Sequence, residues 1–137
     1  MIKKTIYHFF SFLLTLSALI SCSPELPEEI AVAYDDLPEQ LDFNIHVKPI
    51  LSDKCFACHG PDKGKIEAGL QLHSAETAYQ ELPESPGLFA ITPRNLKNSE
   101  MFHRIMSEDA GEIMPPPESN LTLSSREKAI LVRWIEE

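Results

Sequence analysis

Two cysteines and a histidine stand together in the segment Cys55-Phe56-Ala57-Cys58-His59. Two thiols separated by two residues, with an imidazole directly after the second, match the attachment motif of c-type haem. In that chemistry both thiols form thioethers with vinyl groups on one edge of a porphyrin. The histidine then lies under the ring, with an imidazole nitrogen on the proximal side of the iron. We therefore expect one covalent haem, held by Cys55 and Cys58, with His59 as an iron ligand.

Three other uses of these residues need a different context. A thioredoxin-like redox pair requires a strand-helix-strand crossover, and the flanking sequence has no such pattern. A structural zinc site requires four nitrogen or sulfur ligands, whereas His73 and His103 are isolated in the chain. A disulfide between Cys55 and Cys58 would close a very small loop and contribute little loop entropy. Haem attachment is the favoured interpretation.

The distal position of the iron needs a second ligand, and methionine is a candidate. Of the four methionines, Met1 leaves with an export signal described below, and Met101 and Met106 fall in an amphipathic stretch where core packing explains them. Met114 instead lies in an irregular segment, Gly111 to Pro117, that ends in three prolines. Prolines favour a stiff path that would hold a thioether against the iron. Met114 is therefore the expected distal ligand.

The identity of the distal ligand decides the expected function. The alternatives are that Met114 packs on the ring edge while His73 or His103 binds the iron, or that the position is open. With His59 and Met114 both bound, the iron has no vacancy for oxygen or peroxide, and the thioether raises the reduction potential. A closed site transfers electrons, whereas an open one could bind gas. The expected ligands predict an electron-transfer haem domain and not an enzyme.

Short helices and turns are expected to position the motif. Asp42 can cap a helix over residues 43–55, and Pro49 either kinks that helix or restarts it. The turn formers of residues 60–64 end the helix after the motif. Residues 68–72 alternate briefly between polar and apolar and are expected to be extended along the haem edge.

Three more helices complete an expected all-α fold wrapped around the haem. They are predicted over residues 75–82, with Tyr79 as a bulky anchor, over residues 100–107, and from residue 125 onward. Each has a candidate cap: Ser74 for the first, Asn98 or Ser99 for the second, and Ser124 with Glu127 in an S-x-x-E capping box for the last.

The N-terminal residues have the pattern of an export signal. A basic start, Met1-Ile2-Lys3-Lys4, precedes an apolar run over residues 7–20 that is too short and wrongly flanked to span a membrane. The segment Leu19-Ile20-Ser21-Cys22 is similar to a bacterial lipobox, whose cysteine is lipidated and becomes the mature N-terminus. We expect a signal peptide over residues 1–21 and a lipid on Cys22, with an uncleaved anchor as the alternative.

Charge and composition indicate how the exported part behaves. Loss of residues 1–21 removes two lysines, so the net charge changes from −9 to −11, which repels nucleic acid. Residues 22–41 are rich in proline and acidic side chains and are expected to form an extended tether. A short helix over residues 28–34, packed on the domain, is the alternative. The expected location is a membrane on the periplasmic or outer-membrane side, reached through acyl chains on Cys22.

From Asp42 to Glu137 the sequence resembles the planctomycete-type cytochrome c domain. The stretches that carry the resemblance are Phe43-Asn44, Val47-Lys48-Pro49-Ile50-Leu51, residues 55–62, Ala68-Gly69-Leu70, Arg104-Ile105, Met114-Pro115-Pro116-Pro117 and Trp134-Ile135. The resemblance implies a class I-like cytochrome c fold over residues 42–137, a single covalent haem, His59 and Met114 as axial ligands, and electron transfer. It does not name the redox partners. Family members often carry this domain at the start of longer proteins, so a haem relay or sensor domain of a larger exported enzyme is the alternative function.

Overall fold

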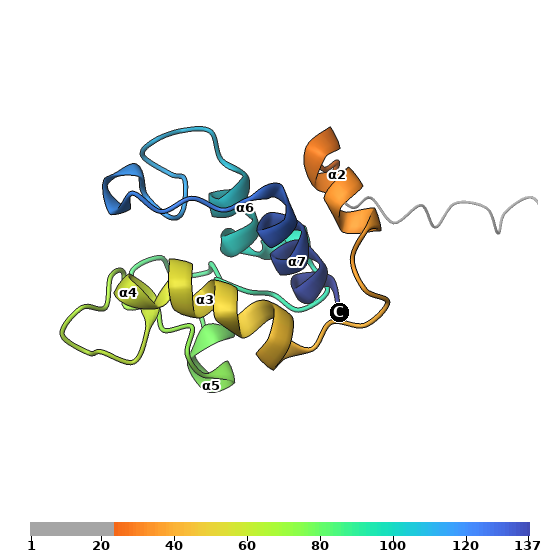
Figure 1. Cartoon of the computed structure of the whole chain (residues 1–137). Helices are drawn as coiled ribbons and strands as arrows, with labels where there is room; N and C mark the ends of the chain where they lie inside the picture. Colours follow the sequence, from red (N-terminus) through yellow and green to blue (C-terminus); the bar gives the residue numbers. More distant parts are fainter. Residues whose placement is uncertain (1–23) are drawn as a thin grey trace, which may run out of the picture.

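The computed structural model describes residues 24–137, which form helices joined by long loops (Figure 1). In chain order the helices are α2 (Glu28–Asp35), η1 (Phe43–Val47), α3 (Lys48–Lys54), α4 (Phe56–His59), α5 (Ala75–Ala78), η2 (Leu96–Asn98), α6 (Glu100–Met106), η3 (Pro117–Ser119) and α7 (Ser125–Glu136). Within these residues the only β pairing is one isolated antiparallel bridge, between Glu81 and Phe89. The predicted all-α fold is confirmed.

The N-terminal predictions fall largely outside the part of the chain that the structure describes. The proposed signal peptide and Cys22 both precede residue 24. Of the helices from Glu28 to the end of the chain, none is both long and apolar enough to cross a membrane.

The hydrophobic core is organised around α7. Its S-x-x-E capping box forms as predicted: the Glu127 amide donates to Ser124 Oγ at 3.2 Å, and the Ser124 amide donates to Glu127 Oε2 at 2.7 Å. The box fixes where the helix begins, and therefore which side chains face inward. Helices α2, η1, α6 and η2 all contact α7. The buried side chains of α7 are Ala129, Ile130, Leu131, Val132 and Ile135.

The segment that leads to the motif is a helix in two pieces. Asp42 caps it as predicted, because its Oδ1 accepts hydrogen bonds from the amides of Asn44 and Ile45 at 2.8 and 3.0 Å. The first piece, η1, is a single π-helical turn, and Pro49 lies in the first turn of α3. A proline is tolerated there because its missing amide needs no intrahelical partner. Pro49 therefore restarts the helix rather than kinking it.

Residues 28–35 correct the prediction of an extended tether. They form α2, and Ile30 is only 2% exposed in the core next to α7. Leu26, Ile30 and Tyr34 recur every four residues and all pack on the core, so one face of this acidic helix is apolar. Burial of that face outweighs the repulsion between acidic residues on the exposed side. The packed helix that the sequence left as the alternative is therefore present.

Two predictions for the middle of the chain are wrong. Residues 68–72 begin in a tight turn rather than an extended strand, with φ of +51° at Ala68 and +66° at Gly69. Helix α5 ends at Ala78 instead of Leu82, and Tyr79 is 39% exposed and does not anchor it. Ser74 does cap this helix through Thr77. The chain leaves α5 early because residues 81–89 fold into a hairpin-like loop instead.

Helix α6 follows the prediction except at its cap. It spans Glu100–Met106 and buries Met101, Phe102 and Ile105. Ser99 is at the N-cap position but does not cap, since its buried hydroxyl lies 3.2 and 2.8 Å from the carbonyl oxygens of Thr92 and Asn95, which share its one proton. A buried hydroxyl needs such partners, and here they fix the loop before α6 rather than the helix end.

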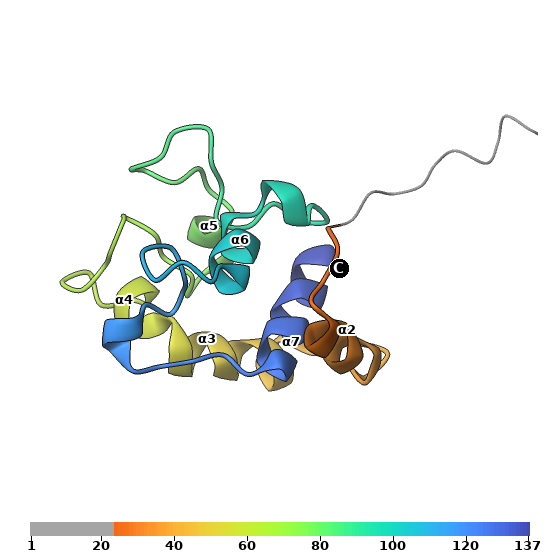
Figure 2. The same ribbon diagram turned by 90° about the horizontal axis from the view of Figure 1, so that it is seen from above.

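Two views show how these elements divide the molecule. Helix α4 and the loop over residues 108–120 lie at one end, and α2 lies at the other end (Figures 1 and 2). Helix α7 passes between them. The C-x-x-C-H motif and the loop that contains Met114 are thus at the same end of the domain, although more than fifty residues separate them in the chain.

Candidate haem site

Helix α4 is a single turn that carries the motif. Cys55 closes α3, with its amide donating to Leu51 O at 2.9 Å, and its φ of −122° separates α3 from α4. The amides of Cys58 and His59 both donate to Cys55 O, at 3.2 and 2.8 Å. The motif is therefore wound into one turn, and residues four apart on such a turn share a face. Cys55 and His59 lie on the same face of it.

Both motif thiols are free and half-buried. Burial raises the pKa of the Cys55 thiol to about 11. A protonated thiol in apolar surroundings is a poor nucleophile and a poor ligand for an exchangeable metal ion. This environment fits a sulfur that is to end as a neutral thioether rather than a metal-bound thiolate.

The His59 ring has an unsatisfied polar atom. Its Nδ1 is buried and has no hydrogen-bond partner. Burial lowers the pKa of His59, and this effect exceeds the opposing contributions of the Leu70 backbone and of Glu67. The imidazole is therefore biased toward its neutral form, which is the form that binds a metal. A buried nitrogen without a partner is rare in folded proteins and is expected where another group completes the site.

The loop after the motif folds back onto it. The amide of Glu67 donates to Cys58 O at 3.0 Å, and the amide of Leu72 donates to His59 O at 2.8 Å. The turn between them uses Gly69, whose φ of +66° suits glycine and whose added Cβ would lie 2.9 Å from Pro83 Cγ. These two hydrogen bonds occupy the carbonyl groups at the end of α4 and hold the motif in place.

Gly60 makes room for the exit from the motif. An added Cβ at this position would lie 2.8 Å from Phe56 Cβ, closer than real Cβ atoms approach one another. Its backbone is extended, with φ of −97° and ψ of −160°. The glycine is therefore required for close approach to the preceding turn, not for an unusual backbone conformation.

Met114 is half-buried in a loop that is fixed to the end of α6. Its amide donates to Arg104 O at 3.0 Å, and the peptide bond to Pro115 is cis. The amides of Glu112 and Ile113 donate to Asp109 O at 2.9 and 2.8 Å. These contacts restrict the loop, so the thioether is presented from an ordered backbone.

The two histidines considered as alternative ligands are both exposed. His103 Nε2 is 2.8 Å from Lys97 O, so that ring has a partner already. His73 lies at the start of the segment that leads into α5. Within residues 24–137, no three His, Cys, Asp or Glu side chains gather closely enough to hold a metal ion. The zinc alternative gains no support from this part of the chain.

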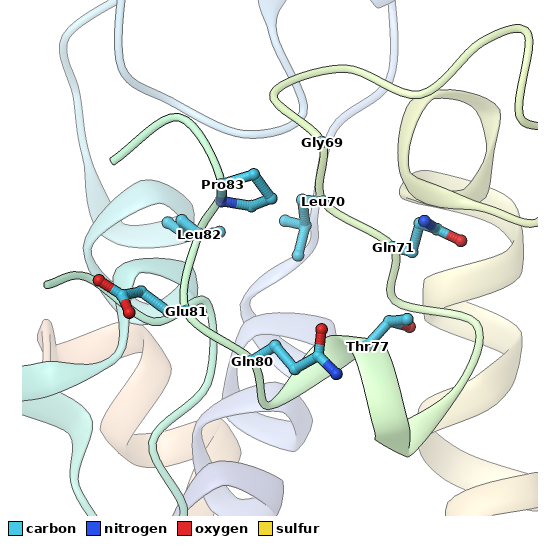
Figure 3. A pocket seen from close by; sticks show the side chains of 8 residues that line it. All are labelled: Gly69, Leu70, Gln71, Thr77, Gln80, Glu81, Leu82 and Pro83. Carbon is cyan, nitrogen blue, oxygen red and sulfur yellow. The ribbon is translucent and has the colours of Figure 1, made fainter. Parts of the chain in front are cut away.

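A cavity of about 150 Å³ lies beside the loop that covers the motif (Figure 3). In Figure 3 Leu70 stands between the two segments that form its walls. Nothing in the sequence pattern indicated it, and none of the four predicted site residues lines it. Pockets for small molecules typically hold about 300–1,000 Å³, so this one is small for a separate ligand. It is lined by Gly69, Leu70, Gln71, Thr77, Gln80, Glu81, Leu82 and Pro83.

The residues present fit a covalently bound haem. Two free thiols, three residues apart, lie on one helical turn and are followed by an imidazole with an unpartnered nitrogen. Phe56, Leu70 and Met106 pack partly buried at the edge of the core and supply apolar surface. A porphyrin attached here would replace solvent against these side chains, and the imidazole of His59 would supply an iron ligand.

A helical domain with this motif on a single half-buried turn has the arrangement of a c-type cytochrome. Residues 55–118 match the family described as planctomycete cytochrome C, and the chain carries a domain of this family over those residues. The match includes Cys55, Cys58, His59 and Met114, and it confirms the family predicted from the sequence. Domains of this family are typically electron carriers rather than enzymes. Neither the curated proteins nor the solved structures gave a match.

Proposed function

We propose that this chain is a monohaem c-type cytochrome that passes single electrons between protein partners. Cys55 and Cys58 would hold the porphyrin through thioethers, and His59 and Met114 would ligate the iron. The observation that carries the proposal is the C-x-x-C-H motif wound into the single turn of α4 in a cytochrome c family domain. When bound, the haem supplies one-electron oxidation and reduction.

The proximal side is supported by contacts that fix the backbone of His59. The turn of α4 follows directly from α3, whose Ile50 and Leu51 are buried in the core. The Leu72 amide, in the loop after the motif, donates a hydrogen bond to the carbonyl of His59. A preorganised backbone at this residue would leave little structural reorganisation for electron transfer to require.

The distal side is supported by the loop that presents Met114. Arg104 and Asp109 hold that loop through backbone hydrogen bonds, and it lies at the same end of the domain as α4 (Figures 1 and 2). A thioether ligand from Met114 would favour the reduced state and would leave no coordination position for oxygen. The role is therefore electron transfer and not oxygen chemistry.

Export and lipidation complete the proposal. A signal peptide over residues 1–21 and a lipid on Cys22 would place the domain outside the cytoplasm on a membrane surface, where c-type haem is attached. Acyl chains on one cysteine give firm membrane binding when there are two or more of them. Residues 24–137 carry a net charge of −11, which disfavours nucleic acid as a partner.

An optical spectrum of the full chain, produced in a host with haem-attachment machinery, tests the haem ligands. We expect sharp α and β bands after reduction and a weak far-red charge-transfer band after oxidation, the pattern of low-spin iron with His and Met ligands. The full chain is preferable to one that begins at Asp42, because α2 packs on α7. A high-spin spectrum that shifts with carbon monoxide would contradict a closed site.

A further inference from the structure

Helix α2 connects the N-terminus to the end of the domain that lies away from the candidate haem site. Both views place α2 at the opposite end from α4 and from residues 108–120 (Figures 1 and 2). The chain therefore enters the folded domain far from the C-x-x-C-H motif. Any anchor before residue 24 pulls on the domain at this far end.

The attachment of α2 to α7 combines apolar burial with polar contacts. Ile30 is 2% exposed, and Tyr34 Oη donates to Glu136 Oε2 at 2.6 Å. Arg133 donates from Nη2 to Glu39 O at 2.7 Å, and its guanidinium lies 5.7 Å from the centre of the Tyr34 ring. These contacts come from both ends of α2, so the helix is held along its length rather than at one point.

Packing of α2 shortens the free chain between Cys22 and the domain. Leu26 is the first residue that packs on the core. Leu26 is four positions after Cys22, and a fully extended chain over four positions spans at most about 14 Å. If residues 22–41 were an extended tether, the same connection would reach about 70 Å. A domain of this size has a radius of gyration of roughly 13 Å and is about 34 Å across. The connection of about 14 Å is shorter than the domain is wide, whereas an extended tether of about 70 Å would be about twice that width.

We propose that α2 orients the domain on the membrane, so that the end with the C-x-x-C-H motif and Met114 points away from the lipid. With a connection shorter than the domain is wide, the motif end cannot turn to touch the bilayer. A redox partner must then approach from the aqueous side. This inference rests on the proposed lipid at Cys22 and on the proposed haem.

Energy transfer from the membrane surface to the haem measures this orientation. The lipidated holoprotein is bound to vesicles that contain anionic lipid and a lipid with a fluorescent headgroup, whose emission the haem absorbs. The test variant has about twenty Gly and Ser residues inserted between Ser23 and Pro24, which leaves α2 docked and lengthens the connection. The matched control has the same residues added after Glu137. An Ile30→Asp variant releases α2 by a second route.

We expect the insertion to raise energy transfer per bound protein roughly two-fold or more, since a flexible linker of this length lets the haem reach the lipid. Ile30→Asp should act in the same direction, and the C-terminal addition should have no effect. Equal transfer in the natural chain and the insertion variant would overturn the proposed orientation. Two further measurements show whether the proposed lipid and haem are present. If Cys22 carries no lipid, the natural chain fails to sediment with vesicles, as Cys22→Ser does. If no haem is attached, the protein has no visible absorbance.

Discussion

The backbone amide of Leu72 donates a hydrogen bond to the carbonyl of His59, over 2.8 Å. Together with the hydrogen bond from the Glu67 amide to the Cys58 carbonyl, it holds the loop over residues 60–72 against helix α4. Two residues of the candidate haem site thus have their carbonyl groups occupied by a segment that contains no cofactor-binding residue itself. The loop acts as the outer support of the motif.

Replacement of Gly60 tests whether the backbone after the motif must pass close to Phe56. In Gly60→Ala the new Cβ meets Phe56 Cβ at 2.8 Å, so the turn has to shift. We expect the free energy of unfolding to fall by about 1–3 kcal/mol, as for other overpacked sites. Urea unfolding of the holoprotein, followed by circular dichroism, measures it. Gly64→Ala is the matched control, because its Cβ would lie 3.5 Å from Asp62 Oδ1, an ordinary contact. An equal loss in both variants would mean that flexibility of the loop, and not close approach, explains Gly60.

The sequence predicted the elements whose signals are local. The S-x-x-E box at Ser124 and the cap at Asp42 depend on residues within one helical turn, and both form. The C-x-x-C-H motif is equally local, and it falls on the single turn that its chemistry requires.

Contacts between distant segments were not predictable in the same way. Acidic residues and prolines favoured a tether over residues 22–41, and the packed helix over residues 28–34 was only the alternative. What decides the outcome is the apolar surface of α7, about a hundred residues later. Likewise, the turn at Ala68 and Gly69 is set by hydrogen bonds back to the motif, which no local pattern shows.

Loss of both motif thiols should prevent stable haem attachment. In a Cys55→Ala, Cys58→Ala double variant no thioether can form, and the turn that carries His59 has few other contacts to retain a porphyrin. We expect the protein from a haem-attaching host to lose its haem during extraction with acidified solvent, whereas the natural chain keeps it. Cys22→Ser is the control, since it removes a thiol outside the motif. Haem that survives extraction in the double variant would show attachment elsewhere.

Met114→Ala should leave the haem attached and change its electronic properties. Removal of the thioether opens the distal position, so we expect a lower reduction potential and binding of carbon monoxide by the reduced protein. Met106→Ala, a change at a half-buried methionine of α6, is the matched control and should preserve the low-spin spectrum. A potential that does not move in Met114→Ala would assign the distal ligand to another residue, and the same measurement on His73→Ala and His103→Ala would then identify it.

The hydrogen bond between Tyr34 and Glu136 predicts a stability change at alkaline pH. Burial, together with this bond, raises the pKa of Tyr34 from 10.0 to about 12. Because the folded state holds the phenolic proton more tightly, the stabilisation is fully present below pH 10 and is lost as pH rises toward 12. The ring is only partly buried, so we expect about 1 kcal/mol between the natural chain and Tyr34→Phe at neutral pH. Urea unfolding of both proteins at neutral pH and above pH 11 measures the difference, which should shrink at the higher pH. Tyr79→Phe, at an exposed ring, is the control. A difference that stays constant with pH would show that Tyr34 stabilises α2 by packing alone.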